Sequence, residues 1–242
     1  LVALVPGRAG AATIEADGDV LLSAQRIEWT LDGPFALRRV ELTLRTPHDR
    51  PLETTVTLPL APNERLHGYA LDVEGELRDA VPVERVKART AFEDTVRRNV
   101  EPALAQKQAG NRYAIRVSPV PAHGERRIRV DVASLAGREA CGWRHRLDPG
   151  VSTTGALPIL ARASVQPVAS GGLAWNRSAG RFQARWQGVD AGRPRQVCLP
   201  APVGDAAFSA AFDDGLRMHW LEVPARAMAT PVPRPKPARV EV

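Results

Sequence analysis

Apolar and polar residues alternate along much of the chain, which is the pattern of β-strands that bury one face. In the first such stretch, Ile27, Trp29 and Leu31 share one side, while charged and polar residues occupy the other. We therefore predict a series of half-buried strands. The alternation recurs at Val40/Leu42/Leu44, Val56/Leu58/Leu60, Tyr69/Leu71/Val73, Tyr113/Ile115/Val117 and Ile128/Val130/Val132.

The last two of these stretches flank a short segment with two prolines, Pro119 and Pro121. We predict that they form a hairpin across residues 119–124. Each proline fixes φ and lacks an amide hydrogen. Pairing between the two strands is therefore expected to begin only near Arg126.

One segment has a helical period instead. Ala88, Phe92, Val96 and Val100 recur every four residues, which places them on one face of a helix. Pro82 suits the first helical turn, where amide groups have no partner inside the helix. We predict one α-helix at about 82–99, embedded between antiparallel strands. Its charged face is compatible with a partner surface, although such a face is more often simply solvated.

The second half of the chain is predicted to form another set of short strands. From Ala136 the sequence is richer in Gly, Ser and Pro, and Asp213-Asp214-Gly215 fits a hairpin turn. Nothing in the sequence decides whether this region packs on the first domain or follows it. Strands are predicted at 159–165, 173–175, 182–186, 196–199, 208–212 and 218–223.

The predicted fold is mostly β: an antiparallel β-sandwich with one embedded helix, followed by an accessory all-β region. The Pro-rich end is typical of a semi-rigid linker and leads us to expect a further domain beyond it. The absence of an initial Met likewise indicates a piece of a longer protein. The predicted parts are an N-terminal segment (1–24), the sandwich (25–135), connecting loops (136–156), the accessory β region (157–228) and the linker (229–242).

Charge and cysteine content narrow the function classes. The net charge is +6, with 30 Arg and 3 Lys, but the arginines are spread over nearly every segment. A nucleic-acid-binding protein would gather them on one face, so we expect no nucleic-acid partner. No stretch approaches the ~20 apolar residues that span a bilayer, so no transmembrane segment is expected within the chain. Cys141 and Cys198 are compatible with one disulfide or with two buried thiols.

Catalytic and metal-binding motifs are missing from the sequence. The five histidines are scattered, and neither a nucleophile elbow nor a phosphate-binding loop is present. Carboxylates are plentiful, but they do not identify a catalytic pair without geometry. We therefore nominate no catalytic, cofactor-binding or metal-binding residue, expect no cofactor, and do not expect an enzyme.

Two features leave alternatives open. Four tryptophans of the second half are candidates for a sugar-binding cleft, although strand tryptophans more often pack a core. Asp213-Asp214 is a candidate calcium turn, although two acids before a glycine are more often a hairpin. The four tryptophans are Trp143, Trp175, Trp186 and Trp220.

An ordered set of short motifs covers roughly residues 25–135. It resembles the VIT domain, the vault protein and inter-alpha-trypsin inhibitor heavy-chain domain. One departure is Glu101-Pro102, where many family members have Asp-Pro. The motifs are Pro59-Leu60, Gly68-Tyr69-Ala70-Leu71, Glu84, Ala88-Arg89, Phe92-Glu93, Glu101-Pro102-Ala103-Leu104, Gly110-Asn111-Arg112-Tyr113, Pro119-Val120-Pro121 and Arg126-Arg127-Ile128.

The resemblance implies a non-catalytic protein–protein interaction or scaffolding module of a larger protein. Such a parent protein is expected to be extracytoplasmic, periplasmic or on the cell surface, and to be secreted or membrane-anchored, with a bacterial source. Family members commonly carry a von Willebrand type A domain with an Asp-x-Ser-x-Ser motif after the VIT domain, and this chain has no such motif. The alternative function is a carbohydrate- or envelope-polymer-binding β-sandwich module.

Overall fold

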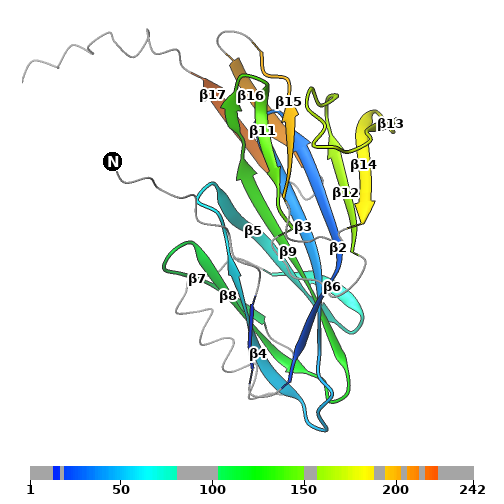
Figure 1. The fold of residues 1–242 in the computed structure, drawn as a ribbon. Coiled ribbons are helices and arrows are strands. Elements are labelled where there is room, and N and C mark those ends of the chain that lie inside the picture. Colours follow the sequence, from blue (N-terminus) through cyan, green and yellow to red (C-terminus); the bar gives the residue numbers. More distant parts are fainter. Residues whose placement is uncertain are drawn as a thin grey trace, which may run out of the picture.

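An eight-stranded sheet runs through the whole molecule, and three smaller sheets pack around it (Figure 1). Its central strands are long because each continues from the lower half of the molecule into the upper half. From one edge to the other its strands are β13 (Asn176–Ser178), β14 (Arg181–Gln187), β12 (Pro158–Ala163), β2 (Leu21–Asp32), β3 (Phe35–Arg45), β9 (Glu125–Leu135), β5 (Glu64–Val73) and β6 (Glu76–Asp79).

The structure, a computed structural model, describes residues 13–16, 19–80, 103–149, 157–187, 194–202, 206–212 and 216–222. All regular secondary structure in these ranges is β, which confirms the mostly-β prediction. The α-helix predicted at about 82–99, the N-terminal residues up to 12 and the Pro-rich segment 229–242 lie outside the described residues.

A four-stranded sheet covers one face of the lower half of the large sheet. The inward side chains of both sheets form one apolar core, in which Val56 and Ile115 from one sheet and Leu42 and Ile128 from the other are essentially inaccessible to solvent. This is the β-sandwich that the alternating pattern predicts. In order, its strands are β1 (Thr13–Ala16), β4 (Leu52–Pro59), β8 (Arg112–Val120) and β7 (Ala103–Gln108).

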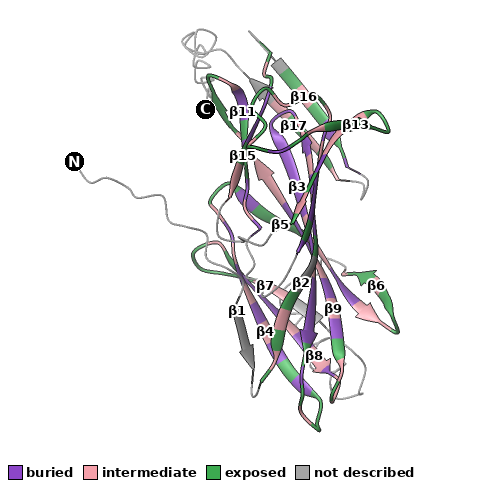
Figure 2. Cartoon of the chain, turned by 45° about the vertical axis from the view of Figure 1, so that its right-hand side comes forward, coloured by how far each residue is buried: buried purple, intermediate pink, exposed green. Residues whose placement is uncertain are grey.

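The upper half of the large sheet is covered on both faces. On one side, Trp143 and Leu199 join the same buried cluster as Trp29. On the other side, a hairpin packs its Phe212 against Phe35 in a separate cluster, so purple buried segments extend along the central strands in Figure 2. The covering strands are β10 (Gly137–Glu139), β11 (Gly142–Leu147) and β15 (Arg195–Leu199) on the first face, and β16 (Ala206–Ala211) and β17 (Arg217–Glu222) on the second.

Three strands of the accessory region, β12, β13 and β14, do not form a separate sheet but belong to the eight-stranded sheet. β12 hydrogen-bonds directly to β2, and β14 then pairs with β12, so both extend the sheet that the first part of the chain begins. β12 also runs parallel to β2, an exception to the antiparallel pairing that the sequence predicts.

The predicted hairpin between the strands around Ile115 and Val130 is wrong. β8 pairs with β4 and β7, whereas β9 pairs with β3 and β5, so the two strands lie in opposite sheets. Pro119 and Pro121 have no amide hydrogens with which to continue a ladder between them. Arg126 holds the crossing segment instead, because its Nε donates to the Pro119 carbonyl at 3.1 Å.

Two further local predictions are also wrong. The loops predicted over 136–156 contain β10 and β11, whose turn needs the positive φ of Gly142 (115°). Residues 173–175, predicted as a strand, have no regular structure. They follow a turn in which Gly171 and Gly172 adopt left-handed conformations and the Leu173 amide donates to the Ser170 carbonyl at 3.2 Å. β13 begins after these residues, at Asn176.

The motif Gly110-Asn111-Arg112-Tyr113 contains a residue with an unusual backbone conformation and several hydrogen bonds. Asn111 adopts a positive φ of 54° between β7 and β8. Its side-chain Nδ2 donates to the carbonyl oxygens of Ala61 at 2.6 Å and Glu64 at 3.1 Å. Asn tolerates the left-handed region better than most residues and carries the donors that this position needs. Asn111 therefore ties the end of the four-stranded sheet to the start of β5.

Cys141 and Cys198 form a disulfide, with Cα atoms 6.1 Å apart. The bond links the turn before β11 to β15, within one small sheet, and spans 57 residues of sequence. Of the two alternatives that the sequence leaves open, the structure contains the disulfide.

We expect the disulfide to stabilise the fold by about 4 kcal/mol, because closing a loop of this length reduces the conformational entropy of the unfolded chain. Denaturant unfolding with and without a thiol reductant measures this difference. The double variant Cys141→Ser/Cys198→Ser should be as stable as the reduced protein and insensitive to reductant. A reductant effect under about 1 kcal/mol would contradict the expectation.

Candidate functional site

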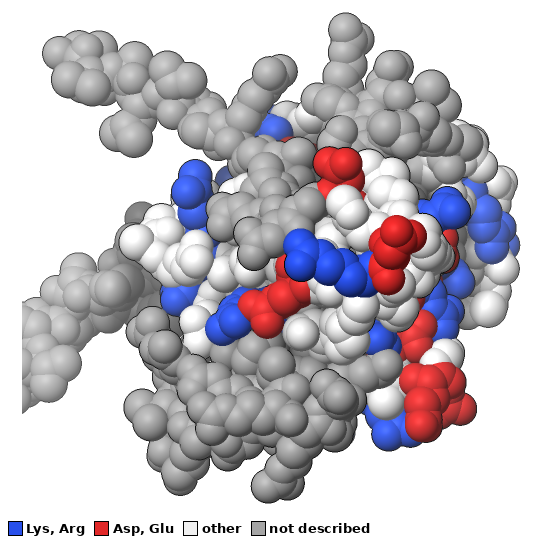
Figure 3. Space-filling view, turned by 90° about the horizontal axis from the view of Figure 1, so that it is seen from below, with Lys and Arg blue, Asp and Glu red and all other residues white. Residues whose placement is uncertain are grey.

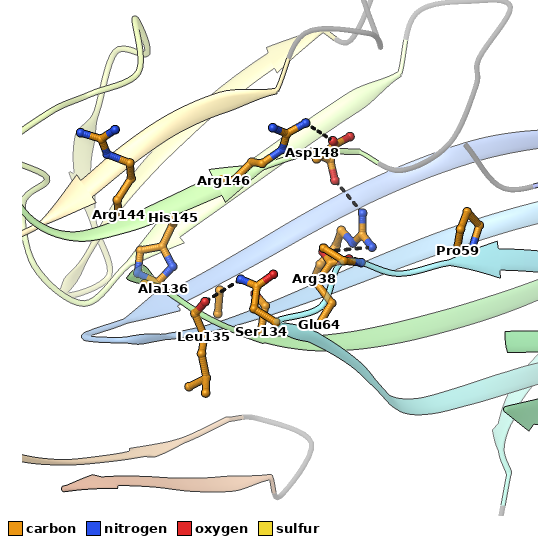
Figure 4. A pocket seen from close by; sticks show the side chains of 13 residues that line it. Arg38, Pro59, Glu64, Ser134, Leu135, Ala136, Arg144, His145, Arg146 and Asp148 are labelled. Carbon is orange, nitrogen blue, oxygen red and sulfur yellow. Dashed lines mark hydrogen bonds and ion pairs between the residues drawn. The ribbon is translucent and has the colours of Figure 1, made fainter. Parts of the chain in front are cut away.

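A small cavity of about 90 Å³ lies where the four-stranded sheet, the start of β5 and the end of β11 meet (Figure 4). Charged and hydrogen-bonding groups from distant parts of the sequence converge on it: Arg38, Asn63, Glu64, His145 and Asp148.

Arg38 is the central group of this cavity. It lies on β3, opposite Trp29 on β2, and its guanidinium stacks over the Trp29 ring at 5.5 Å. The side chain is only 3% exposed. Its Nη1 donates to the Asp148 carbonyl at 2.6 Å, and its Nη2 lies 3.5 Å from Oε1 of Glu64. A buried guanidinium requires such partners, because removing a charge from water without them is costly.

Glu64 carries the opposite charge and is itself buried. Its Oε2 accepts a hydrogen bond from the Ala61 amide at 2.9 Å. Next to it, the Asn63 side chain donates to the Leu135 carbonyl at 2.7 Å, which binds the β4–β5 loop to the end of β9. Figure 4 shows Arg38 between Asp148 and Glu64, while Arg144 points away from them.

His145 is the one buried histidine among the described residues. Its Nε2 lies 2.8 Å from the carbonyl oxygen of Gly33, in the turn between β2 and β3. Burial lowers the pKa of His145 to about 4, and the hydrogen bond to Gly33 opposes this effect only in part. At neutral pH the ring is therefore uncharged, and because a carbonyl only accepts, Nε2 carries the proton.

The arrangement joins parts of the fold rather than presenting a reactive group. Arg38, Glu64 and His145 each have a partner within the protein. The cavity is also well below the several hundred Å³ that is usual for small-molecule sites. Its evident effect is to fasten the segment after β11 to β3 and β5.

The outer face of the large sheet carries a second set of charged groups. On it, Asp131 of β9 binds Arg39 of β3 at 2.9 Å and also binds Arg129, which reaches Asp79 of β6. Nearer the opposite edge, Glu28 binds Arg162 at 3.0 Å and also Arg26. Basic and acidic side chains are interleaved in the same way at the lower end of the molecule (Figure 3).

The tryptophans do not form a shared cleft. Trp143 is buried and makes edge-to-face contacts with Phe208 and Trp220, at centroid distances of 5.7 and 6.0 Å. Trp175 donates to the Ser170 carbonyl in its own turn at 3.2 Å. Trp186 borders an open groove.

The structure also bears on the calcium turn, the metal ligands and the transmembrane segment considered from the sequence. Asp213-Asp214 lies outside the described residues. Within the described ranges, no three His, Cys, Asp or Glu side chains are grouped as metal ligands, and no helix is long and apolar enough to cross a membrane.

Arg38 and His145 were missed from the sequence, although a signal was present. Arg38 falls on the same side of the alternating pattern as Val40 and Leu42. His145 likewise falls on the same side as Trp143 and Leu147. Each is a polar residue at an inward position of an alternating strand. Such a residue needs a buried partner.

The fold and these buried contacts define a β-sandwich module whose second half completes the sheet of the first. Residues 22–132 match the sequence model of the vault protein inter-alpha-trypsin domain. This part of the chain, from β2 to β9, is a VIT domain. VIT domains are generally protein-interaction modules.

Solved structures show distant similarity. A candidate nutrient-binding protein from Legionella pneumophila is 10% identical, with 79% of this chain and 72% of that chain covered and a TM-score of 0.44. An M1 zinc metallopeptidase from Deinococcus radiodurans is 12% identical (88% and 50% covered, TM-score 0.40), so the match spans half of that enzyme. A candidate protease from Parabacteroides distasonis is 12% identical (83% and 39% covered, TM-score 0.32). No curated protein is significantly similar. These similarities are too weak to carry a functional conclusion.

We expect Arg38→Met to lower the free energy of unfolding by about 3–5 kcal/mol, because it leaves the Glu64 carboxylate buried without its cation. Denaturant titration measures the change. Adding Glu64→Gln, which keeps an acceptor for the Ala61 amide, should restore part of the loss.

The matched control is Arg45→Met on the same strand. Arg45 is 65% exposed and lies 3.8 Å from Glu125, so its loss should cost under about 1 kcal/mol. If the Arg38→Met/Glu64→Gln variant is no more stable than Arg38→Met alone, the unpaired carboxylate is not the cause of the instability.

His145 makes the stability depend on pH in a defined direction. In the unfolded chain its pKa is near 6.5, and in the folded protein it is about 4. The contribution is fully present above about pH 6.5 and is lost as the pH falls toward 4, a total of about 3 kcal/mol. His145→Gln keeps an N–H for the Gly33 carbonyl and should remove this component of the pH profile. The exposed control His219→Gln should retain it, and identical profiles for both variants would contradict the assignment.

Proposed function

We propose that the chain is a non-catalytic protein–protein interaction and scaffolding module within a larger protein. The observation that carries the proposal is the VIT domain at residues 22–132, since domains of this family are generally interaction modules. The continuous sheet supports it, because a rigid frame can hold a partner and a neighbouring domain in fixed relation. A von Willebrand type A domain elsewhere in a bacterial parent protein is part of the same proposal.

The proposal of a non-catalytic role is supported by the polar cavity. Its buried charged pair and its neutral histidine are held by interactions within the protein. A catalytic site instead needs groups that are free to contact a substrate.

We further propose an extracytoplasmic location for the protein. The disulfide between Cys141 and Cys198 supports it, because disulfides form and persist mainly in oxidising compartments. Anchoring of the parent protein in a membrane is compatible with this location and belongs to the proposal.

Binding of a carbohydrate or envelope polymer is the second candidate function. The observation that favours it is Trp186, a partly exposed aromatic residue beside arginines in an open groove. Binding to a glycan array that is lost in Trp186→Ala, with folding intact, would support it. No binding to any glycan would remove it.

The proposed function is tested by crosslinking the parent protein to its neighbours in the cells that produce it. Proteins recovered with the parent should be lost when residues 22–132 are replaced by an unrelated β-sandwich of similar size, and fractionation should place the parent outside the cytoplasm. The same set of proteins recovered from both forms would overturn the interaction role. Recovery of the parent in the cytoplasm would overturn the location.

A further inference from the structure

We propose that the edge of the large sheet at β14, together with the arginine-lined groove beside it, binds an extended acidic peptide segment of a partner protein as an added β-strand. This inference rests on the proposed interaction function and names the surface and the chemistry of the partner. It follows from the shape of the groove, its charge and the hydrogen-bonding state of the strand edge.

The groove is shallow and open, with a volume of about 540 Å³, and lies across β2, β12 and β14. Leu160 of β12 lies opposite Arg185 of β14 and opposite Glu28 of β2. Cross-strand partners point to the same side of a sheet, so these side chains share the outer face. Leu160, 8% exposed, forms an apolar floor, and the surrounding arginines are Arg26, Arg162 and Arg185.

The charge of the groove is positive. Two carboxylates on neighbouring positions oppose the three arginines: Glu28, which binds both Arg26 and Arg162, and Glu41, which lies opposite Arg26 on β3. Partial burial acts to raise the pKa of Glu28, but the hydrogen bond and charge of Arg162, with the charge of Arg26, hold that pKa below its usual value. Glu28 is therefore ionised at neutral pH and neutralises one of the three positive charges.

Of the three groove arginines, Arg185 has the weakest contacts within the described residues. Within the described part of the chain, its Nη2 reaches only the Gln183 side-chain oxygen, at 3.5 Å, and the residue is exposed. A carboxylate on a strand added beside β14 would lie next to Arg185. Complementary charge of this kind selects partners and orients them.

The neighbouring strand edge is open. β13 pairs only with Arg181–Gln183 of β14, so the following stretch, 184–187, has a paired strand on the β12 side and none on the other side among the described residues. In Figure 1 this is the lower end of β14, at the outer edge of the sheet. In an antiparallel pair, alternate residues direct both N–H and C=O away from the neighbour. Such an edge accepts an extended peptide through main-chain hydrogen bonds.

Together these features specify the peptide. On an added strand, every second side chain would face the same side as Arg185. A segment with Asp or Glu at alternate positions therefore brings carboxylates next to Arg185 while its backbone pairs with β14. A nucleic acid or an acidic polysaccharide satisfies the charge but has no regularly spaced amide groups for the strand edge, so a peptide fits the observations better.

The test measures fluorescence anisotropy of a labelled peptide of alternating Glu and Val on the chain of residues 1–242. The comparison probes are the same peptide with Lys in place of Glu, the acidic peptide with N-methylated amides, and polygalacturonate. We expect binding of the acidic peptide alone, weakened about tenfold in Arg185→Glu. The matched control is Arg217→Glu, an exposed residue of β17 with the same charge change, which should bind normally.

Each other outcome overturns part or all of the proposal. Equal binding of the N-methylated peptide excludes strand addition, and equal loss in Arg217→Glu reduces the effect to net charge. Binding of polygalacturonate without the peptide assigns the groove to a carbohydrate. If Arg185→Glu in the parent protein keeps every crosslinked partner that the VIT domain recruits, this surface is wrong while the proposed function stands.

Discussion

The buried guanidinium of Arg38 is the constraint on which the arrangement of the two halves depends. A charge removed from water at this depth needs compensation from within the protein. Its partners are the Glu64 carboxylate at the start of β5 and the Asp148 carbonyl after β11, a residue 110 positions away in sequence. Glu64 balances the charge from within the VIT domain, whereas the hydrogen bond to the Asp148 carbonyl forms only when the segment that follows the domain is in place.

The sequence predicts most of the strands because each has one buried face. In β2 the inward residues Ile27, Trp29 and Leu31 are separated by residues that reach solvent at least in part, and this contrast is local. Pairing between strands is not local. The stretches around Ile115 and Val130 show the same alternation whether they pair with each other or face each other across a core. β10 escapes prediction because its three residues are all exposed and have no contrast to detect.

The candidate sites were harder to predict than the strands. Inward-facing Arg38 and His145 are visible as irregularities in the sequence, but the groups that bind them come from a turn and from strand ends, which have no pattern of their own. The groove combines Arg26, Arg162 and Arg185, which are distant in sequence and meet only because β12 inserts between β2 and β14. A parallel pair such as β2 and β12 leaves no turn motif from which this neighbourhood could be inferred.

The pairing of β12 with β2 also bears on how such a domain can be reused. The family match ends at residue 132, before β12, yet β12 forms hydrogen bonds along one edge of β2. Without β12, β2, which contains Ile27 and Trp29, would be an exposed edge strand, and such strands promote aggregation. The region that follows the VIT domain therefore protects this edge of the sheet by pairing with it. Recombination that moved residues 22–132 alone into a new protein would have to supply another strand in its place.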